Sequence, residues 1–350
     1  MKYDTSSKRR RLSIITLLLG VALITAACSS ASSSATSTKS AATTSSVKGT
    51  FYELYQSCPS NPFWVAVNNG GRAAAAVLGV KLKTEDPLKC TGEIAAENSL
   101  LTTIINSHPA GIAVSVVSPT ALSANIKRAR ALHIPIIAYN SLPHDNNYSI
   151  NPVEGYVGQP NYTAGQDFGK KILATYNLHA GQTIMVADNC YINVTCDERW
   201  EGMKSVVAPH GITVNVLNLD YNIPTSAGIV KSYLQTKGKP ALVFAIASAG
   251  EQAVVEAAQA LHYTPSTFPP MVGFDDDPVT NTYMKEGWVK MTDDQQPFLQ
   301  GFDALVDLYD AVKYHAHPIN MSTGPVFFEY NSTNIAKGYF KTSVVKNTGI

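Results

Sequence analysis

Residues 111–140 read GIAVSVVSPTALSANIKRARALHIPIIAYN, and this stretch decides the fold. Residues 112–117 and 134–139 are almost entirely apolar, and each run has the length of a strand. Residues 120–132, which lie between them, form a predicted helix. Strands that lack polar alternation are buried on both faces, so the stretch predicts two parallel strands of a sheet that helices cover.

The same alternation of strand and helix continues on both sides of this stretch. It begins with predicted strands at 51–55 and 80–83 and predicted helices at 61–78 and 92–107. A second series has strands at 183–187, 212–219, 242–247 and 271–274, and helices at 163–176, 198–208, 226–234 and 251–261. Two series of about 100 residues or more predict an α/β fold of two similar doubly wound lobes with parallel sheets. A ligand is expected at the carboxyl ends of the strands, in a cleft between the lobes.

The charge and the motifs of the chain exclude several classes of function. The 350 residues include 27 Lys and Arg and 26 Asp and Glu, so the net charge of +1 favours neither nucleic acid nor anionic lipid. The chain contains no Gly-x-Ser-x-Gly elbow, no His-Glu-x-x-His and no phosphate-binding loop. We therefore expect no enzyme. The alternative is a secreted hydrolase that uses an unrecognised acid pair, Asp275 with Asp293 or Asp294.

The first 46 residues are expected to export and tether the protein. Basic residues 8–11 precede an apolar run at 12–27, which is the build of a secretory signal. Cys28 directly follows two alanines, and this arrangement resembles the lipobox of bacterial lipoproteins, in which the thiol is acylated. A plain signal peptide with an incidental cysteine is the alternative. Residues 29–46 contain only Ser, Thr, Ala and one Lys, so 28–46 is predicted to be a lipid anchor with a disordered tether.

Four cysteines remain once Cys28 is assigned to the anchor. An even number outside the cytoplasm usually indicates disulfides. Cys190 and Cys196 bracket a short segment and are expected to form a local bridge, which leaves Cys58 to pair with Cys90. A zinc site is the alternative, but no histidine lies near either pair. We therefore expect no metal.

Seven short motifs resemble, in the same order, those of the ribose/galactose-type periplasmic binding proteins. They are Asn61-Pro62-Phe63-Trp64, 75–80 (AAVLGV), Gly111-Ile112 with Ser118-Pro119, 134–139 (IPIIAY), 199–203 (RWEGM), 272–275 (VGFD) and 294–297 (DQQP). The resemblance covers residues 50–328. It implies a type 1 fold whose first lobe is 47–159 with 296–324, whose second lobe is 160–295 with 325–350, and whose hinge has three segments.

The resemblance also implies where a ligand would bind. In that family a small polyhydroxylated ligand lies between aromatic rings and is held at its rim by charged and amide groups. At the matching positions we expect Asn61, Phe63, Trp64, Ser118, Asn140, Ser141, Arg199, Tyr221, Ser248, Asp275 and Gln295. Rings pack on the C–H faces of a sugar, and its hydroxyls need partners once they are buried. Such binding needs no cofactor.

Some of these residues also have a structural interpretation. Phe63 has the core-facing spacing of its predicted helix and could simply be packed, whereas Trp64 lies off that face. Arg199 could pair with Glu198 or Asp197 on the surface.

Two acidic residues near the end of the last predicted strand are assigned different roles. Asp277 directly precedes a proline and is predicted to cap a helix, which leaves Asp275 as the carboxylate for the ligand.

One pair departs from the family pattern and leaves the sugar open. Asn140-Ser141 stands where the family often has Asp-Arg, so one anionic acceptor and one cationic donor are missing. A different sugar, a deoxy sugar, a polyol or a signalling furanose would fit. The segment 247–252 cannot be aligned with the family, and Ser248 is our choice within it.

The resemblance implies an exported, monomeric receptor, lipid-anchored to the outer face of the cell membrane, that closes around its solute and delivers it to an ABC permease. A chemoreceptor or sensor kinase, with a non-sugar or signalling ligand, is the alternative partner. Lactose-repressor-type regulators share the two lobes, but residues 1–48 cannot form their DNA-binding helices.

Overall fold

The structure, a computed structural model, describes residues 47–89, 94–118, 120–147, 149–191, 193–318 and 320–329. These residues belong to one compact unit of the chain. The predicted signal, Cys28 and the tether lie outside the described residues, and so does Cys90.

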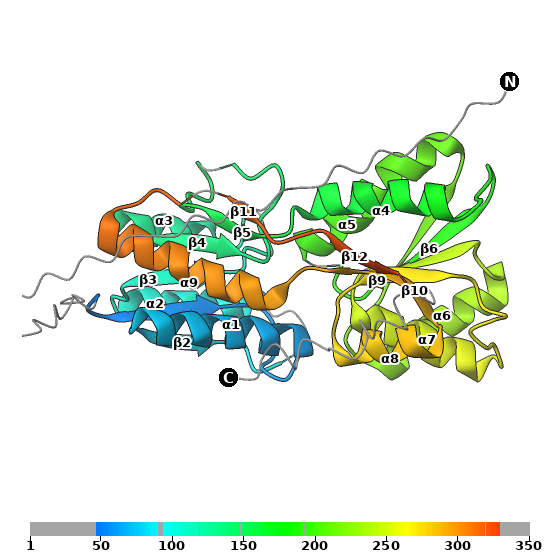
Figure 1. Ribbon diagram of the computed structural model, residues 1–350, viewed down its shortest axis with the longest axis horizontal. Helices are drawn as coiled ribbons and strands as arrows, with labels where there is room; N and C mark the ends of the chain where they lie inside the picture. Colours follow the sequence, from blue (N-terminus) through cyan, green and yellow to red (C-terminus); the bar gives the residue numbers. More distant parts are fainter. Residues whose placement is uncertain are drawn as a thin grey trace, which may run out of the picture. The chain divides into compact units, whose positions relative to one another are not determined.

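The first sheet has six parallel strands in the order β11-β5-β4-β3-β1-β2. They are β1 (Thr50–Leu54), β2 (Lys81–Glu85), β3 (Gly111–Val114), β4 (Ile136–Tyr139), β5 (Tyr156–Gly158) and β11 (Met321–Ser322). Helices α1 (Pro62–Leu78) and α9 (Pro297–Tyr314) cover one face, and α2 (Ile94–Asn106) and α3 (Ser123–Ala131) cover the other. Figure 1 shows α1 and α9 side by side, although they are far apart in the sequence. We call this sheet with its helices the first lobe.

The second sheet also has six strands, in the order β12-β10-β9-β8-β6-β7. They are β6 (Thr183–Asp188), β7 (Thr213–Asn218), β8 (Leu242–Ala245), β9 (Met271–Phe274), β10 (Val289–Asp294) and β12 (Val326–Glu329), of which only β12 is antiparallel to its neighbour. Helices α4 (Asn161–Thr175) and α5 (Val194–Val207) cover one face, and a short 3-10 helix, η1 (Ala208–His210), follows α5. Helices α6 (Ile223–Lys237), α7 (Ser248–Ala260) and α8 (Pro278–Glu286) cover the other face. This is the second lobe.

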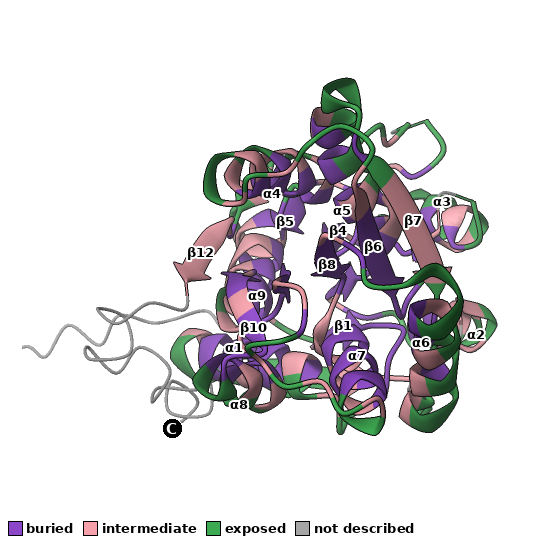
Figure 2. Ribbon diagram, turned by 90° about the vertical axis from the view of Figure 1, so that its right-hand side faces the viewer, coloured by how far each residue is buried: buried purple, intermediate pink, exposed green. Residues whose placement is uncertain are grey.

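The apolar strands are buried on both faces, as their sequences predict. In β4, Ile136 and Ala138 belong to the core beneath α2 and α3, whereas Ile137 and Tyr139 belong to the core beneath α1 and α9. Figure 2 shows the same pattern in the second lobe, where β6 and β8 are buried and the outer faces of the helices are exposed. The two lobes of parallel strands and alternating helices confirm the predicted fold class.

The chain passes between the two sheets three times. It leaves the first sheet after β5 to enter α4, returns after β10 to form α9, and leaves again after β11 to form β12. The sequence did not predict β5, β10, β11 or β12. Two of them have only three and two residues, too few to show a periodicity, and β10 carries a lysine and two aspartates among its six residues.

Candidate ligand-binding site

A cavity of about 270 Å³ opens where strand ends of both sheets come together. Asn140 follows β4, Asp275 follows β9 and Gln295 follows β10, so three lining residues lie at carboxyl ends of strands. Parallel sheets place ligand sites there because the loops after their strands converge. Nine of the eleven predicted residues line the cavity: Asn61, Phe63, Trp64, Asn140, Arg199, Tyr221, Ser248, Asp275 and Gln295.

The structure does not bring the two remaining predicted residues, Ser118 and Ser141, to the cavity. The Ser118 hydroxyl accepts a hydrogen bond from the Ala121 N–H at 3.3 Å and so closes a turn. Ser141 is fully buried behind the cavity wall, where it donates to Asn140 Oδ1 at 3.1 Å. Both serines therefore stabilise loops next to the cavity and do not line it.

Arg199 is the cation of the site, and its guanidinium is held from several directions. Nε donates to Asn161 Oδ1 at 3.0 Å and Nη1 donates to the Ile246 carbonyl at 2.9 Å. Nη2 donates to Gln295 Oε1, and the group lies 4.3 Å above the centre of the Phe274 ring. Only 4% of the residue is exposed, so the alternative of a surface ion pair with a neighbouring acid is wrong. Burial lowers the pKa of this arginine.

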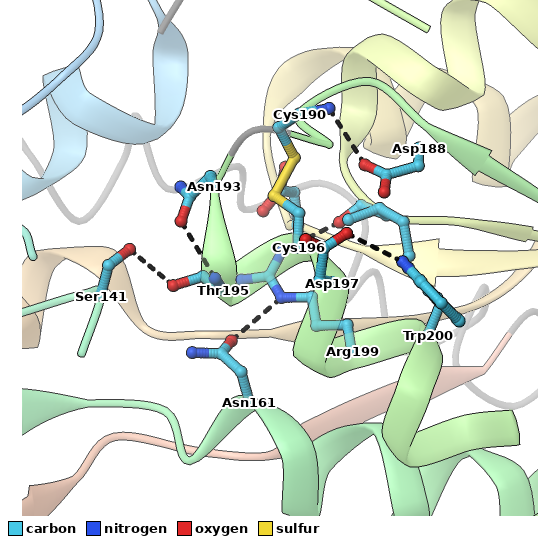
Figure 3. The surroundings of a disulfide bond; sticks show 12 residues. Ser141, Asn161, Asp188, Cys190, Asn193, Thr195, Cys196, Asp197, Arg199 and Trp200 are labelled. Carbon is cyan, nitrogen blue, oxygen red and sulfur yellow. Dashed lines mark hydrogen bonds between the residues drawn. A yellow bond between two sulfur atoms is a disulfide. The ribbon is translucent and has the colours of Figure 1, made fainter. Parts of the chain in front are cut away.

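Close packing of α4 against α5 places Arg199 in the cavity wall. A Cβ atom at Gly165 of α4 would overlap the Arg199 carbonyl, and one at Gly202 of α5 would overlap the Tyr162 carbonyl. The two glycines therefore let the helix backbones touch. Figure 3 shows the result, with Arg199 reaching from α5 to Asn161 at the start of α4.

Asp275 supplies the anionic side of the same network. Its Oδ1 accepts from Gln295 Nε2 at 2.7 Å and its Oδ2 accepts from the Ser248 N–H at 3.1 Å. Its φ of +89° lies in a region that residues with a side chain rarely adopt, and such strain concentrates at functional sites. Burial, followed by the neighbouring Asp277, raises the pKa of Asp275 to about 6, although Arg199 opposes this shift. Near neutral pH the group is therefore mainly a carboxylate that accepts hydrogen bonds.

Asp277 caps α8, as predicted. Its Oδ1 accepts from the backbone N–H groups of Val279 and Thr280 at 2.8 and 2.9 Å. Asp275, rather than Asp277, is therefore the acid that is hydrogen-bonded to the network around Arg199 through Gln295.

The expectation that Trp64 lies off the core-facing side of α1 is wrong, whereas Phe63 is partly buried and packs against the same core. Trp64 is the core residue, with 4% exposure, and it stacks on Tyr55 with ring centres 4.3 Å apart. Its ring also meets the edge of Tyr139 at 5.9 Å, whereas Phe63 is only partly buried. Trp64 lies three residues before the core residue Val67, so both side chains are on the same side of α1. The rings of Tyr55 and Tyr139, at the ends of β1 and β4, pack against Trp64. Both rings still line the cavity.

The disulfide Cys190–Cys196 is present, as predicted, and it closes the turn that leads into α5 (Figure 3). The two thiols are therefore not free to bind zinc. Asn193 within this turn caps α5, because its Oδ1 accepts from the Thr195 N–H at 3.0 Å. Cys58 is also in a disulfide, while its pairing with Cys90 stays a prediction.

The first turn of α5 also contacts the first lobe. The Val194 N–H donates to the Val117 carbonyl at 3.0 Å, and the Thr195 hydroxyl donates to Ser141 Oγ at 2.6 Å. Nearby, Glu198 Oε1 accepts from the backbone N–H of His144 at 2.7 Å. These bonds hold the two lobes together beside the cavity.

Several lining residues were not singled out from the sequence: Gln56, Ser60, Asn193, Thr195 and Gln252. One signal was available, because Cys190-x-x-Asn193 repeats the spacing of Cys58-x-x-Asn61. The other four give no local signal, since they reach the cavity only through the way the lobes fold and meet.

The acid pairs of the hydrolase alternative do not meet in the cavity. Asp293 is buried outside the lining, where it accepts from the Val326 N–H at 2.8 Å and from Gln159 Nε2. Asp294 accepts from the Gln296 N–H at 2.7 Å and does not line the cavity either. Asp275 thus has no second acid of either proposed pair beside it in the cavity.

Residues 56–316 match the family model of the periplasmic binding protein domain. The chain belongs to this family. A curated relative, the xylose/arabinose-binding protein of Sulfolobus acidocaldarius, is 28% identical over 288 residues, which cover 77% of this chain and 68% of the relative.

Solved structures of periplasmic binding proteins share the fold. A periplasmic sugar-binding protein of an ABC transporter from Legionella pneumophila is 25% identical, with a TM-score of 0.71 over 79% of this chain and all of that chain. A solute-binding protein from Burkholderia graminis in complex with D-arabinose is 21% identical, with a TM-score of 0.74 over 83% and 97%. A carbohydrate transporter from Acidothermus cellulolyticus in complex with myo-inositol is 22% identical, with a TM-score of 0.72 over 85% and 99%.

Membership of this family settles two of the expectations. Periplasmic binding proteins are transport receptors that hold a solute without changing it, so this protein is not an enzyme. The family also places the protein outside the cytoplasm. Within the described residues, we find no helix that combines the length and the apolar character needed to cross a membrane.

Proposed function

We propose that this periplasmic binding protein is a sugar receptor that feeds an ABC permease. One observation carries the proposal: a buried arginine and a buried carboxylate share one amide, Gln295, in the wall of a cavity that also has aromatic rings. A sugar needs both kinds of surface, because its hydroxyls must be paired once dry and its C–H faces pack on rings. A relative named for xylose and arabinose, and a neighbour in complex with D-arabinose, support this class of ligand.

The charged groups would bind the rim of the sugar. Arg199 donates only, and the Asp275 carboxylate accepts only, so together they select a ligand that offers both acceptors and donors. Hydrogen bonds to charged groups are the stronger ones, and both groups are already fixed by protein partners before a ligand arrives. Trp64 and Phe63 would face the apolar side of the ring.

The delivery step follows from the two lobes. We take residues 47–159 with 296–324 as one rigid lobe and 160–295 with 325–350 as the other, so that the three crossings act as the hinge. Closure buries the sugar from both sides and presents one combined surface to the permease, as hinge motion does in related receptors. The protein would act as a monomer, since the cavity draws residues from both lobes of one chain.

The membrane anchor is part of the proposal. Cys28 would carry the lipid, and residues 29–46 would hold the folded body away from the bilayer. Replacing Cys28 by alanine should move the protein from the membrane fraction to the soluble fraction without changing its thermal unfolding. Protein that stays membrane-bound after this change would contradict the anchor and leave the receptor function untouched.

A ligand screen tests the receptor function. The protein is purified without its predicted signal, and its thermal unfolding is followed with D-xylose, L-arabinose, D-glucose, D-galactose and myo-inositol. A ligand at about 100 times its Kd stabilises the folded state by about 2.7 kcal/mol, so a specific sugar should raise Tm by several degrees. The Arg199→Ala variant should lose that shift. A flat response of the wild-type protein to every sugar and polyol would overturn the proposal.

A further inference from the structure

The first lobe has an outer end, which lies away from the cavity. The strands of the first sheet are parallel and their carboxyl ends face the cavity, so they begin at the outer end, and helices α1, α2, α3 and α9 end there. Figure 1 shows this end at the left. The chain enters β1 from Val47, so the predicted tether joins the fold here. The outer end consists of residues 47–49, 77–81, 106–110, 128–135, 152–155 and 313–317.

The outer end is basic, although the net charge of the whole chain is only +1. Strand β2 shows the gradient, because it begins with Lys81 at the outer end and finishes with Glu85 at the other. Glu154 is the acid of the outer end, and Asp310 lies one turn before the end of α9. The cations of the outer end are Lys48, Lys81, Arg128, Arg130 and Lys313.

Exposed apolar side chains share the outer end with these cations. Val77 at the end of α1 is 77% exposed, Tyr314 at the end of α9 is 62% exposed, and Leu132 just after α3 is 44% exposed. Lys313 lies over the rings of Tyr309 and Tyr314, at 4.9 and 5.1 Å from their centres. Rings beside long cationic side chains suit a boundary between water and lipid, because each has an apolar body and a polar tip.

A hollow between the end of α9 and the loop before β4 adds hydrogen-bond donors. Arg130, His133, His315 and His317 line it together with Glu154. Arg130 pairs with Glu154 at 3.6 Å, but its side chain is 55% exposed, and exposed pairs contribute little stability. The guanidinium can therefore turn to a phosphate group, which it matches in geometry, and the imidazole N–H groups can donate to the same oxygens.

The ends of the helices explain only part of this pattern. A cation in the last turn of a helix is stabilised by the helix dipole, which accounts for Arg128, Arg130 and Lys313. The dipole accounts neither for Lys48 and Lys81 nor for the exposed apolar side chains. At the corresponding end of the second lobe, where α4, α6, α7 and α8 end, no large apolar side chain of the described residues is exposed.

We propose that the outer end of the first lobe docks on a membrane surface that contains anionic phospholipids. The cations attract the phosphates, the hollow holds a headgroup, and Val77, Leu132 and Tyr314 enter the interfacial layer. The occupant is a membrane because a tether of the length of residues 29–46 would span about 25 Å, which keeps this end of the fold nearest to the anchor. Docking goes beyond the proposed sugar receptor and does not depend on a bound sugar.

Vesicle binding by protein that carries no lipid tests the docking. The chain is purified without its predicted signal and with Cys28→Ala, so that only the protein surface can bind. In about 0.1 M salt it should sediment with vesicles of phosphatidylglycerol and phosphatidylcholine, and not with phosphatidylcholine alone. Each cation near an anionic surface changes binding about 5-fold, so Lys48→Glu, Lys81→Glu and Arg130→Glu together should weaken it by at least about 100-fold.

A matched control reverses three exposed lysines of the second lobe. Lys204→Glu, Lys237→Glu and Lys285→Glu change the net charge by the same amount, and this variant should bind the vesicles like the wild-type protein. Thermal unfolding, with and without sugar, should be unchanged in both triple variants, which controls for folding.

A second pair of variants tests the apolar contribution. Val77→Ser with Tyr314→Ser removes exposed apolar groups from the ends of α1 and α9, and binding should weaken by at least about 5-fold. Val65→Ser with Leu299→Ser changes exposed residues at the starts of the same helices and should leave vesicle binding unchanged.

The outcomes separate docking from the proposed function. A wild-type protein that ignores the anionic vesicles overturns docking and leaves the sugar receptor intact. Equal losses in the two triple variants also overturn it, since the attraction would then follow net charge. Inorganic phosphate is titrated into the wild-type protein as well, and phosphate binding without vesicle binding would make the hollow a site for a soluble anion and overturn docking.

Discussion

Two turns with the same pattern lead into the cavity, one from each lobe. Cys58 is followed three residues later by Asn61 at the start of α1, and Cys190 is followed three residues later by Asn193 at the start of α5. In each turn the asparagine N–H donates to the cysteine carbonyl, at 3.2 and 2.8 Å. In each, the asparagine side chain accepts from the N–H two residues further on, at 3.1 and 3.0 Å. The backbone is therefore built alike on the two sides.

The side chains that follow the two turns differ. In the first lobe they are Phe63 and Trp64, and Trp64 is part of the apolar core through Tyr55 and Tyr139. In the second lobe they include Arg199, which is held by hydrogen bonds and lies against the Phe274 ring. One wall is therefore an extension of the core, and the other is a polar network. We call the wall with Phe63 and Trp64 the first wall and the wall with Arg199 the second wall. We expect changes in the first wall to act mainly on stability and changes in the second wall to act mainly on affinity.

The largest effect should come from removing the ring of Trp64. Trp64→Ala leaves a cavity in the core of the first lobe and should lower the free energy of unfolding by about 3–5 kcal/mol. Urea unfolding of the ligand-free protein measures this change. Val65, the next residue, is exposed, and Val65→Ala should change stability by less than about 0.5 kcal/mol. A loss as small as that of the control would show that the first wall is not an extension of the core.

The second wall should respond in the opposite way. Arg199→Ala removes a donor that a bound sugar needs, so the free energy of binding should weaken by about 2 kcal/mol or more. Titration calorimetry with the sugar found in the screen measures the loss, and Asp275→Ala should give a similar one. Lys204→Ala, on the exposed side of the same helix, is the matched control. Wild-type affinity in both the Arg199 and Asp275 variants would contradict the assignment of this wall to the ligand.

The contrast between the walls also explains what the sequence predicted well. The unit around residues 111–140 was predictable because its strands are buried on both faces and therefore have an unbroken apolar sequence. Arg199 and Asp275 were found because they belong to motifs with a recognisable order. Trp64 was wrongly placed off the core-facing side of its helix, because the rings that receive it come from strand ends distant in the sequence.

Other parts of the site were not predictable from the sequence for a related reason. Thr195 and Gln56 line the cavity only because loops of both lobes meet there, and neither belongs to a local pattern. Ser141 matches the family position, yet it turns to Thr195 instead of the cavity, which depends on the contact between the lobes. Contacts of this kind are decided by tertiary packing.

The close helix pairs offer a smaller test of the same contrast. A Cβ at Gly70 of α1 would overlap the Phe298 carbonyl of α9, just as one at Gly165 would overlap the Arg199 carbonyl. Each alanine substitution should lower the free energy of unfolding by about 1–3 kcal/mol. Only Gly165→Ala should also weaken sugar binding, because displacing α5 moves Arg199. Gly228→Ala in α6 meets no atom within 4 Å and serves as the control, which should be neutral or slightly stabilising.

The Gly70→Ala and Gly165→Ala variants are compared by unfolding in urea and by titration with the sugar. Equal losses of affinity in Gly70→Ala and Gly165→Ala would mean that the position of α1 matters as much as that of α5. The division between a wall that supports stability and a wall that supports affinity would then fail.

The smallest expected effect is a dependence of affinity on pH. Affinity and stability should change with pH in opposite directions, and this difference in sign separates an effect on binding from an effect on folding. The pKa of Asp275 in the free protein is about 6, and a sugar hydroxyl donates a stronger hydrogen bond to the carboxylate than to the protonated acid. Affinity should therefore be constant above pH 7 and should fall by at most about 10-fold per pH unit below 6, because the proton competes with the ligand. Titrations at pH 5 and pH 8 measure the change. Asp275→Asn should remove it.

The stability of the ligand-free protein should change with pH in the opposite direction. Folding raises the pKa of Asp275 above its ordinary value of 3.8, and burial also raises those of Asp188 and Asp293, each to about 7. A raised pKa means that the folded state binds the proton more tightly, so the free energy of unfolding falls as pH rises from about 4 to about 7. Between pH 5 and pH 8 the free protein should thus lose stability while its affinity for sugar increases. Affinity that falls together with stability would show that Asp275 does not accept from the ligand as a carboxylate, and that the second wall acts on binding only by keeping the lobe folded.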